Sequence, residues 1–293
     1  MRIKIFFYSE DANFFYRLNI ALARLRISFK ILNIGSKIPN YPCLILTTSN
    51  EISKLKLHFN RNAKILSYGK EDDFEQYILR ILAAIRIGYK EKYSELTFSI
   101  DPGTRHIGLV VFLDNYYLNS HTLHEKVDLI KILKNYVNFL QENNQGEINL
   151  YFKFGKGVFH ITVDLVKTIY SEFKCIKCVK VLLIDEAKSS QIKIREAETK
   201  ILLSKHEASA LVLALRKGIE VDQENYLKIF RNSNFKKSKK ENIEEIRFEK
   251  SNGTILTFEE IAKRILTGEM SLKETLRMYQ ENSIVDWRKK QYI

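Results

Sequence analysis

The fold of this chain is decided by one stretch, TFSIDPGTRHIGLVVF at residues 97–112. Apolar, β-branched and aromatic residues on both sides of Asp101 predict two buried strands, and Pro102, Gly103 and Gly108 supply the turn between them. The first strand ends at Asp101, which we expect to be exposed at a sheet edge. A carboxylate placed there costs desolvation unless it meets a cation. We therefore interpret Asp101 as a candidate metal ligand or catalytic acid, with a turn aspartate as the alternative.

The chain length predicts more than one domain, since 293 residues exceed a typical single core. Alternating short β-type and helical patterns predict a small parallel α/β domain at residues 1–92. A polar segment then leads to a second domain at 93–218, which contains the opening stretch. A basic linker at 219–253 and a helical hairpin at 254–293 are expected to follow.

Charge is the most informative feature of the composition. The formal net charge of +13 favours polyanionic partners, with nucleic acid first and an anionic membrane second. The apolar run at 78–87 is interrupted by Arg80 and Arg86, so we expect no membrane span. The apolar start is too short for a signal peptide, and three cysteines suit a reducing compartment. We expect an intracellular, cytoplasmic protein.

The N-terminal domain lacks the motifs of common α/β ligand sites. A receiver-type domain needs an aspartate at the end of its third strand, where Thr47 and Thr48 stand, and no G-x-G-x-x-G follows the first strand. A docking or dimerisation role remains for this domain, and a homodimer is an open alternative.

The second domain shows a longer series of predicted elements. After the two opening strands we expect a third antiparallel strand at 116–123, and then alternating helices and strands at 125–142, 148–154, 158–173, 179–184 and 207–216. The predicted fold class is therefore α/β, with a mixed sheet of three antiparallel strands followed by parallel strands.

This element order is that of the RNase H-like fold. Ile100-Asp101-Pro102-Gly103-Thr104 through Gly108 resembles the first catalytic motif of the RuvC-type Holliday-junction resolvases. His206-Glu207-Ala208-Ser209-Ala210 through Leu215 is similar to their last-helix motif. The resemblance covers residues 95–217. It implies two divalent metal ions, Mg²⁺ or Mn²⁺, held by about four acidic or histidine side chains, and a branched or duplex DNA substrate.

Two residues match the implied metal ligands and two depart from them. Asp101 and His206 carry over, whereas Lys153 and Ser209 stand where the resemblance places acids. A site with one carboxylate and one histidine binds a divalent metal weakly, which predicts impaired chemistry. Glu207 is a substitute acid, although it points about 100° away from His206 on the helix. Glu186 is another, from a strand expected two places from the Asp101 strand.

Several basic and turn residues are predicted to contact nucleic acid. Lys153 is interpreted either as a cation that pairs with Asp101 or as a solvated strand-end lysine, and Gly155-Lys156-Gly157 either as a phosphate loop or as a turn. The full predicted set is Arg105, His106, Lys153, Lys156, Lys188, Lys193, Arg195, Lys236, Lys237, Lys239 and Lys240.

Other patterns are weaker. Cys175 and Cys178 have zinc-knuckle spacing but no second pair, so two reduced cysteines are favoured. His121 and His124 are expected at the surface or an edge. Capping boxes at 257–260 and 271–274 predict two C-terminal helices that pack on the body or on a partner, with a helix-turn-helix reader as the alternative.

Two hypotheses share this fold and partner class. In the first, the protein is a metal-dependent endonuclease for branched DNA, with Asp101 as ligand, His206 as ligand or general base, and Glu207 or Glu186 in support. In the second, it is a degenerate member that binds nucleic acid without cutting it and needs no cofactor. The runner-up class is an actin-like phosphate-binding ATPase, because Asp-x-Gly-Thr also follows a strand in such proteins.

Overall fold

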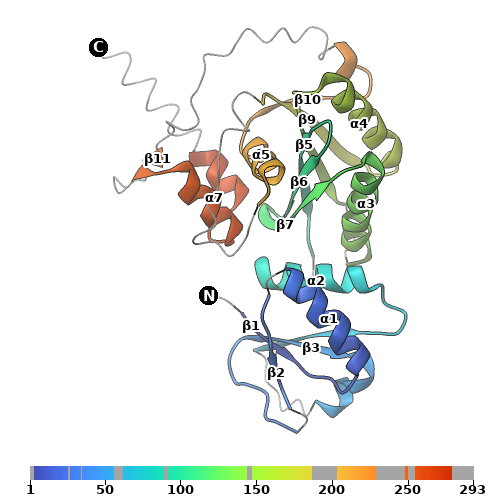
Figure 1. The fold of residues 1–293 in the computed structure, drawn as a ribbon, viewed down its shortest axis with the longest axis vertical. Coiled ribbons are helices and arrows are strands. Elements are labelled where there is room, and N and C mark those ends of the chain that lie inside the picture. Colours follow the sequence, from blue (N-terminus) through green and yellow to red (C-terminus); the bar gives the residue numbers. More distant parts are fainter. Residues whose placement is uncertain are drawn as a thin grey trace. The chain divides into compact units, whose positions relative to one another are not determined.

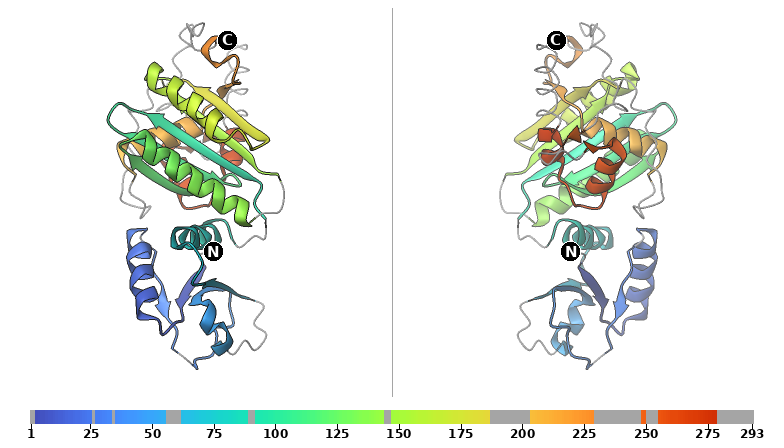
Figure 2. Two further views of the ribbon diagram at one scale, coloured as in Figure 1. Left: turned by 90° about the vertical axis from the view of Figure 1, so that its right-hand side faces the viewer. Right: turned by 90° about the vertical axis from the view of Figure 1, so that its left-hand side faces the viewer.

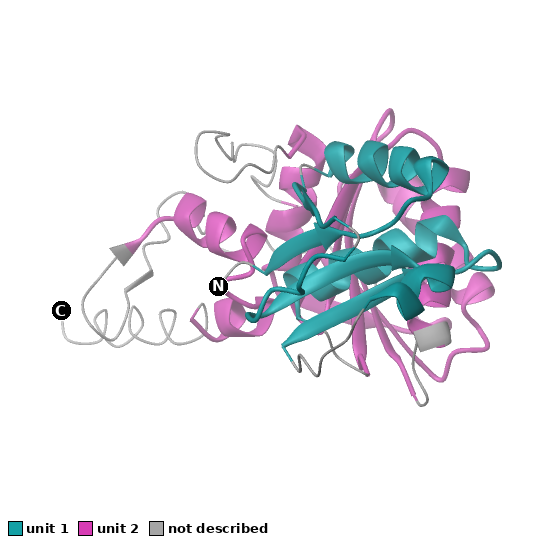
Figure 3. Cartoon of the chain, turned by 90° about the horizontal axis from the view of Figure 1, so that it is seen from below, with its two compact units in different colours: residues 1–90 teal, residues 91–293 magenta. Residues whose placement is uncertain are grey.

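The computed structural model describes residues 3–25, 27–33, 35–55, 62–88, 92–143, 147–186, 203–228, 248–249 and 255–278. The chain divides into two compact units, Met1–Lys90 and Glu91–Ile293 (Figure 3). Within the described ranges, no helix is long and apolar enough to cross a membrane.

The first unit is a four-stranded parallel sheet flanked by helices (Figure 1). Its elements in chain order are β1 (Lys4–Phe7), α1 (Ala12–Arg24), β2 (Lys30–Ile31), β3 (Cys43–Thr48), the 3₁₀ helix η1 (Ser49–Lys54), β4 (Ala63–Tyr68) and α2 (Phe74–Arg86). The strand order is β2-β1-β3-β4. Asp11 and Asp73 cap the two α-helices by accepting the backbone N–H groups of Phe14 and Gln76.

Apolar side chains alternate across this sheet to form two small cores. One core contains Phe7, Leu44 and Leu46 together with side chains of helices α1 and α2. The other contains Phe6, Ile45 and Leu55, which directly follows η1. After β3 the chain forms the short 3₁₀ helix η1, which ends at Lys54.

The second unit contains a six-stranded mixed sheet in the order β10-β9-β8-β5-β6-β7. Its elements are β5 (Glu95–Pro102), β6 (Ile107–Leu113), β7 (Tyr116–Leu123), α3 (Lys126–Asn143), β8 (Asn149–Gly155), α4 (Phe159–Glu172), β9 (Cys178–Ile184), α5 (Lys205–Ala214), β10 (Gly218–Val221), β11 (Phe248–Glu249), β12 (Ile255–Leu256) and α7 (Phe258–Leu266). Strands β5, β6 and β7 are antiparallel, and β5, β8 and β9 are parallel. The predicted α/β fold class is therefore confirmed.

Helices cover both faces of this sheet, with α3 and α4 on one face and α5 and α7 on the other (Figure 2). On the first face Phe98 of β5 stacks on Phe152 of β8, with ring centroids 5.1 Å apart. On the second face α5 packs on β5 and β6 and shares a core with α7 and with a helix at 272–278. Gly218–Val221, which span the predicted boundary between the second domain and the basic linker, form β10, which pairs antiparallel with β9.

The C-terminal helices follow their predicted caps. Thr257 and Glu260 form a capping box at the start of α7, and Ser271 and Glu274 exchange the same pair of bonds before the next helix. The Leu272 N–H donates to the carbonyl of Asn115 in the β6–β7 turn at 2.7 Å. These helices therefore pack on the body of the second unit. The sequence left open whether they would pack there or on a partner.

Candidate functional site

Asp101 lies near the end of the central strand β5, where it pairs in register with Gly108 of β6. Only 15% of its side chain is exposed, so the expectation of an exposed acid at the sheet edge was wrong. Burial raises the pKa of the Asp101 carboxyl to about 6, although a hydrogen bond from Ser209 and the charge of Lys205 act in the opposite direction. The ionised form of Asp101 is therefore destabilised where it stands.

The first turn of α5 reaches Asp101 because Gly108 has no side chain. A Cβ at Gly108 would lie 2.1 Å from the carbonyl oxygen of His206, so a larger residue would push the helix away. His206 consequently places its Nδ1 3.8 Å from Asp101 Oδ2. The structure thus brings together the two residues that the RuvC resemblance assigned as ligands.

Glu207 has a different role in the structure. Its carboxylate accepts the backbone N–H of Ser204 at 2.7 Å, and its own N–H donates to the Ser204 hydroxyl at 3.2 Å. This reciprocal pair is a capping box, which satisfies backbone donors at the start of α5. Glu207 is buried, and its carboxylate serves the helix end.

Glu186 comes to the site from the end of β9, two strands away from β5. It crosses the intervening strand β8 above Gly155 and Gly157, where a Cβ would lie 2.0 Å from Glu186 Oε1 and 1.9 Å from Oε2 respectively. The Gly155-Lys156-Gly157 loop therefore cradles a carboxylate of the protein. Because both glycines lack side chains, Glu186 can reach toward Asp101.

The electrostatics of Glu186 couple it to Asp101. Burial raises the pKa of the Glu186 carboxyl, the Gly157 N–H lowers it by a hydrogen bond, and the negative charges of Asp101 and Asp185 raise it again. Glu186 Oε1 is enclosed and has no hydrogen-bond partner among the described residues. Two desolvated, like-charged acids with an unsatisfied oxygen form an arrangement that a cation would stabilise.

Lys153 is not engaged with Asp101. Its side chain is buried in register with Ser99, and its Nζ donates to the carbonyl oxygens of Ala214 at 2.5 Å and Arg216 at 3.2 Å. Burial lowers the pKa of Lys153 to about 8, while the charge of Glu95 acts to raise it. Lys153 therefore holds the C-terminal end of α5, which fits neither interpretation offered from its sequence position.

Histidines gather beside Asp101. The His106 ring lies 4.8 Å from the His124 ring and 5.1 Å from the His206 ring, measured between centroids. His124 is exposed, as expected. His121 is half-buried on the edge strand β7, where its Nε2 lies 2.8 Å from the Tyr136 hydroxyl, and burial lowers its pKa to about 4.

Only some of the residues predicted to contact nucleic acid lie in the described part of the chain. Arg105 is exposed in the turn after β5, and Lys156 is half-buried in the loop after β8. Burial lowers the pKa of Lys156, with the charge of Asp185 acting in the opposite direction. Outside the described residues lie Lys188, Lys193, Arg195, Lys236, Lys237, Lys239 and Lys240.

No complete metal site is already formed in the part of the chain that the structure describes. No group of three or more His, Cys, Asp or Glu side chains there is arranged to hold a metal ion. Asp101 and Glu186 fit a hard divalent cation in chemistry, because both offer carboxylate oxygens, but they are two ligands where such ions take six or more.

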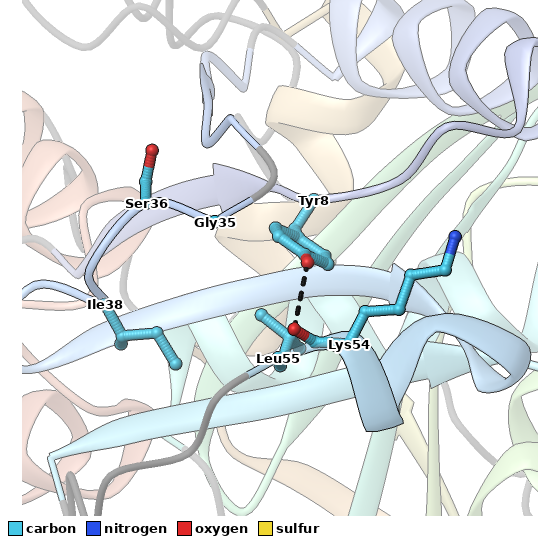
Figure 4. A pocket seen from close by; sticks show the side chains of 6 residues that line it. All are labelled: Tyr8, Gly35, Ser36, Ile38, Lys54 and Leu55. Carbon is cyan, nitrogen blue, oxygen red and sulfur yellow. Dashed lines mark hydrogen bonds between the residues drawn. The ribbon is translucent and has the colours of Figure 1, made fainter.

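The first unit has a small pocket lined by Tyr8, Gly35, Ser36, Ile38, Lys54 and Leu55 (Figure 4). Next to it, at the C-terminal ends of β1 and β3, the Glu51 carboxylate accepts the Glu10 N–H at 2.7 Å and the Thr48 hydroxyl at 2.6 Å. Ligands of doubly wound folds bind where strand order reverses, which here is between β1 and β3. The Glu51 carboxylate therefore lies at the position between β1 and β3 where a ligand of such a fold would bind.

Sequence reasoning missed the roles of three glycines and one serine. Gly108 was interpreted as a turn residue, and Gly155 and Gly157 as part of a phosphate loop or a turn, yet each permits a close approach between elements far apart in sequence. Ser209 was interpreted as a lost acid, yet it donates a hydrogen bond to Asp101. Gly155 at the end of a buried strand was the available signal, since glycine in a strand often marks a close approach.

Comparisons with known proteins add a weak likeness of fold. No family model matches the chain, and no curated relative matches it. A solved exopolyphosphatase from Cytophaga hutchinsonii is similar over 55% of this chain and 54% of its own, at 12% identity and a TM-score of 0.13. The Aquifex aeolicus member of the Ppx/GppA family is similar over 70% and 71%, at 8% identity and a TM-score of 0.14. The chain thus spans about half the length of the first of these proteins.

Proposed function

We propose that the second unit binds nucleic acid at the C-terminal edge of β5 and β8 and hydrolyses it slowly, with one divalent cation held by Asp101 and Glu186. The observation that carries this proposal is the Glu186 carboxylate, which crosses β8 over two glycines and lies close enough for the Asp101 charge to raise its pKa. Glu186 is one of the two substitute acids that the sequence predicted, and Glu207, the other, is engaged in a helix cap.

The chemistry of the donor set supports Mg²⁺ or Mn²⁺. Both acids are desolvated, and one oxygen of Glu186 has no hydrogen-bond partner among the described residues, so a cation would offset the cost of their burial. A bound cation would neutralise charge on a phosphodiester as it reacts. Two protein ligands predict weak affinity that improves when a substrate phosphate supplies further oxygens.

The neighbouring side chains have defined tasks in this proposal. Ser209 donates to Asp101 and thereby orients its carboxylate, while His206 at 3.8 Å is placed to hold or release a proton beside it. Arg105 and Lys205 are exposed cations near the site, and the net charge of +13 favours a polyanionic substrate.

The test is a cleavage assay on labelled four-way junctions, duplex DNA, single strands and RNA, with Mg²⁺, Mn²⁺ or chelator. We expect metal-dependent cutting that Asp101→Asn and Glu186→Gln each reduce by about 100-fold or more, since each removes one of two charged ligands. Glu220→Gln, an exposed change on β10, is the matched control and should cut like wild type.

Two results would overturn the proposal in different ways. If the protein binds nucleic acid but shows no metal-dependent cutting, the catalytic half of the proposal is wrong and the protein is a degenerate member that only binds. Polyphosphate and ATP belong in the same assay, because an actin-like phosphate-binding ATPase is the second candidate on account of Asp101-Pro102-Gly103-Thr104. Cleavage of these anhydrides in place of nucleic acid would show that the substrate class is wrong.

A further inference from the structure

Three imidazole rings from distant parts of the second unit meet beside Asp101. His106 belongs to the turn between β5 and β6, His124 follows β7, and His206 lies in the first turn of α5. His106 is central, with ring centroids 4.8 Å from His124 and 5.1 Å from His206. The carboxylate of Asp101 approaches His206 Nδ1 at 3.8 Å.

These spacings match those of histidines that share a metal ion. A nitrogen about 2.1 Å from a tetrahedral zinc ion places the centroid of its ring about 3.2 Å from the metal, and two such rings have centroids about 5.2 Å apart. The two observed separations lie within half an ångström of this value.

One nitrogen of the cluster lacks a partner. His106 Nδ1 is enclosed, and no hydrogen bond to it exists among the described residues. A buried ring nitrogen without a hydrogen-bond partner costs free energy, and a bound metal would give this nitrogen a partner. Imidazole nitrogens select Zn²⁺ and its neighbours among the transition metals over Mg²⁺, which prefers oxygen ligands.

We propose that His106, His124 and His206, with Asp101, form a site for a late first-row transition metal such as Zn²⁺. As they stand, these side chains are not arranged to hold a metal ion, so binding requires them to turn toward a common point, and His124 is exposed and has room to do so. The site shares Asp101 with the Asp101–Glu186 pair but selects a different metal, because its other ligands are nitrogen atoms. Its existence does not depend on the proposed cleavage of nucleic acid.

The test is a titration of the untagged full-length chain with Zn²⁺ by calorimetry and with Co²⁺ by visible absorption. We expect one site per chain, and a loss of affinity of about tenfold or more in His106→Gln and in His124→Gln, since even partners outside the ligand shell matter by this factor. His160→Gln, on the exposed start of α4, is the matched control and should bind like wild type.

A cysteine pair provides the necessary competing explanation. Cys175 and Cys178 are free thiols, and Cys175 is exposed, so they offer an alternative zinc ligand set. In a Cys175→Ser, Cys178→Ser chain we expect the site to persist, with no thiolate-to-cobalt absorption. Loss of binding in that variant, unchanged affinity in both histidine variants, or no binding at all would overturn the inference. Glu186→Gln should leave Zn²⁺ affinity unchanged while it removes cleavage, which separates failure of this site from failure of the proposed function.

Discussion

Asp101 is held in a state that favours its neutral form. Its carboxylate is largely buried beside Ser209 and His206, and its pKa of about 6 lies above the ordinary value of 3.8. The shift corresponds to about 3 kcal/mol of differential stabilisation between the protonated and ionised forms. A buried acid of this kind lowers the stability of the folded chain at neutral pH, which is typical of residues retained for function.

Replacing Asp101 with asparagine should therefore stabilise the protein. In chelator, where no cation can compensate, we expect Asp101→Asn to raise the free energy of unfolding by about 1–3 kcal/mol at neutral pH. The folded carboxyl binds its proton more tightly than the unfolded one, so wild type loses stability as pH rises from about 4 to about 6, and the gain vanishes below that window. Chemical denaturation at a series of pH values measures the gain in the free energy of unfolding. A gain of equal size at all pH values would contradict the raised pKa of Asp101.

Lys153 predicts the opposite dependence on pH. Burial lowers the pKa of its ammonium from 10.5 to about 8, so the unfolded chain binds the proton more tightly. Stability should rise between about pH 8 and about pH 10, by up to about 3 kcal/mol, and Lys153→Met should abolish this rise. The exposed Lys180→Met is the control. If Lys153→Met keeps the rise, another group causes it and the pKa of Lys153 is not lowered by burial.

At the level of elements, strands bearing glycine decide which side chains meet. Gly108 lets the start of α5 settle on β6, and Gly155 lets the end of β9 reach over β8. Both glycines lie in strands that pair directly with β5, so both approaches converge on Asp101. The site is therefore a product of sheet order combined with two missing side chains.

Gly155→Ala tests this arrangement without removing any charge. The new Cβ would fall 2.0 Å from Glu186 Oε1, and because that atom ends a flexible side chain, Glu186 should move away with a change in stability of less than about 1 kcal/mol. Metal-dependent cleavage should fall by about tenfold or more, as a displaced ligand predicts. Gly69→Ala, where the nearest atoms are 3.4 Å away, is the control. Full activity in Gly155→Ala would show that Glu186 is not a ligand.

At the scale of the whole molecule, charge governs the expected affinity for nucleic acid. With a net charge of +13, binding should weaken steeply with salt. Contacts to as few as two phosphates predict a loss of about tenfold between about 50 and about 200 mM salt. Fluorescence anisotropy with labelled duplex and junction DNA measures this slope, and affinity independent of salt would contradict an electrostatic interface.

The sequence by itself determined the class of the fold and most of its elements. Apolar periodicity predicted β7 to the residue and placed β5, β6, β8 and β9 of the mixed sheet, because each pattern reflects the local alternation of buried and exposed positions. Asp101 and His206 could also be paired from sequence, through motifs of the resemblance. Short polar segments, such as β10, carried no such signal.

Only the tertiary structure decided the composition of the site. Lys153 points along β8 to the end of α5, Glu207 closes a helix cap, and Glu186 arrives from two strands away. Each outcome depends on where elements distant in sequence come to lie, and on which positions between them lack a side chain. Local patterns record whether a residue is buried, whereas the partner that it meets there follows from packing in three dimensions.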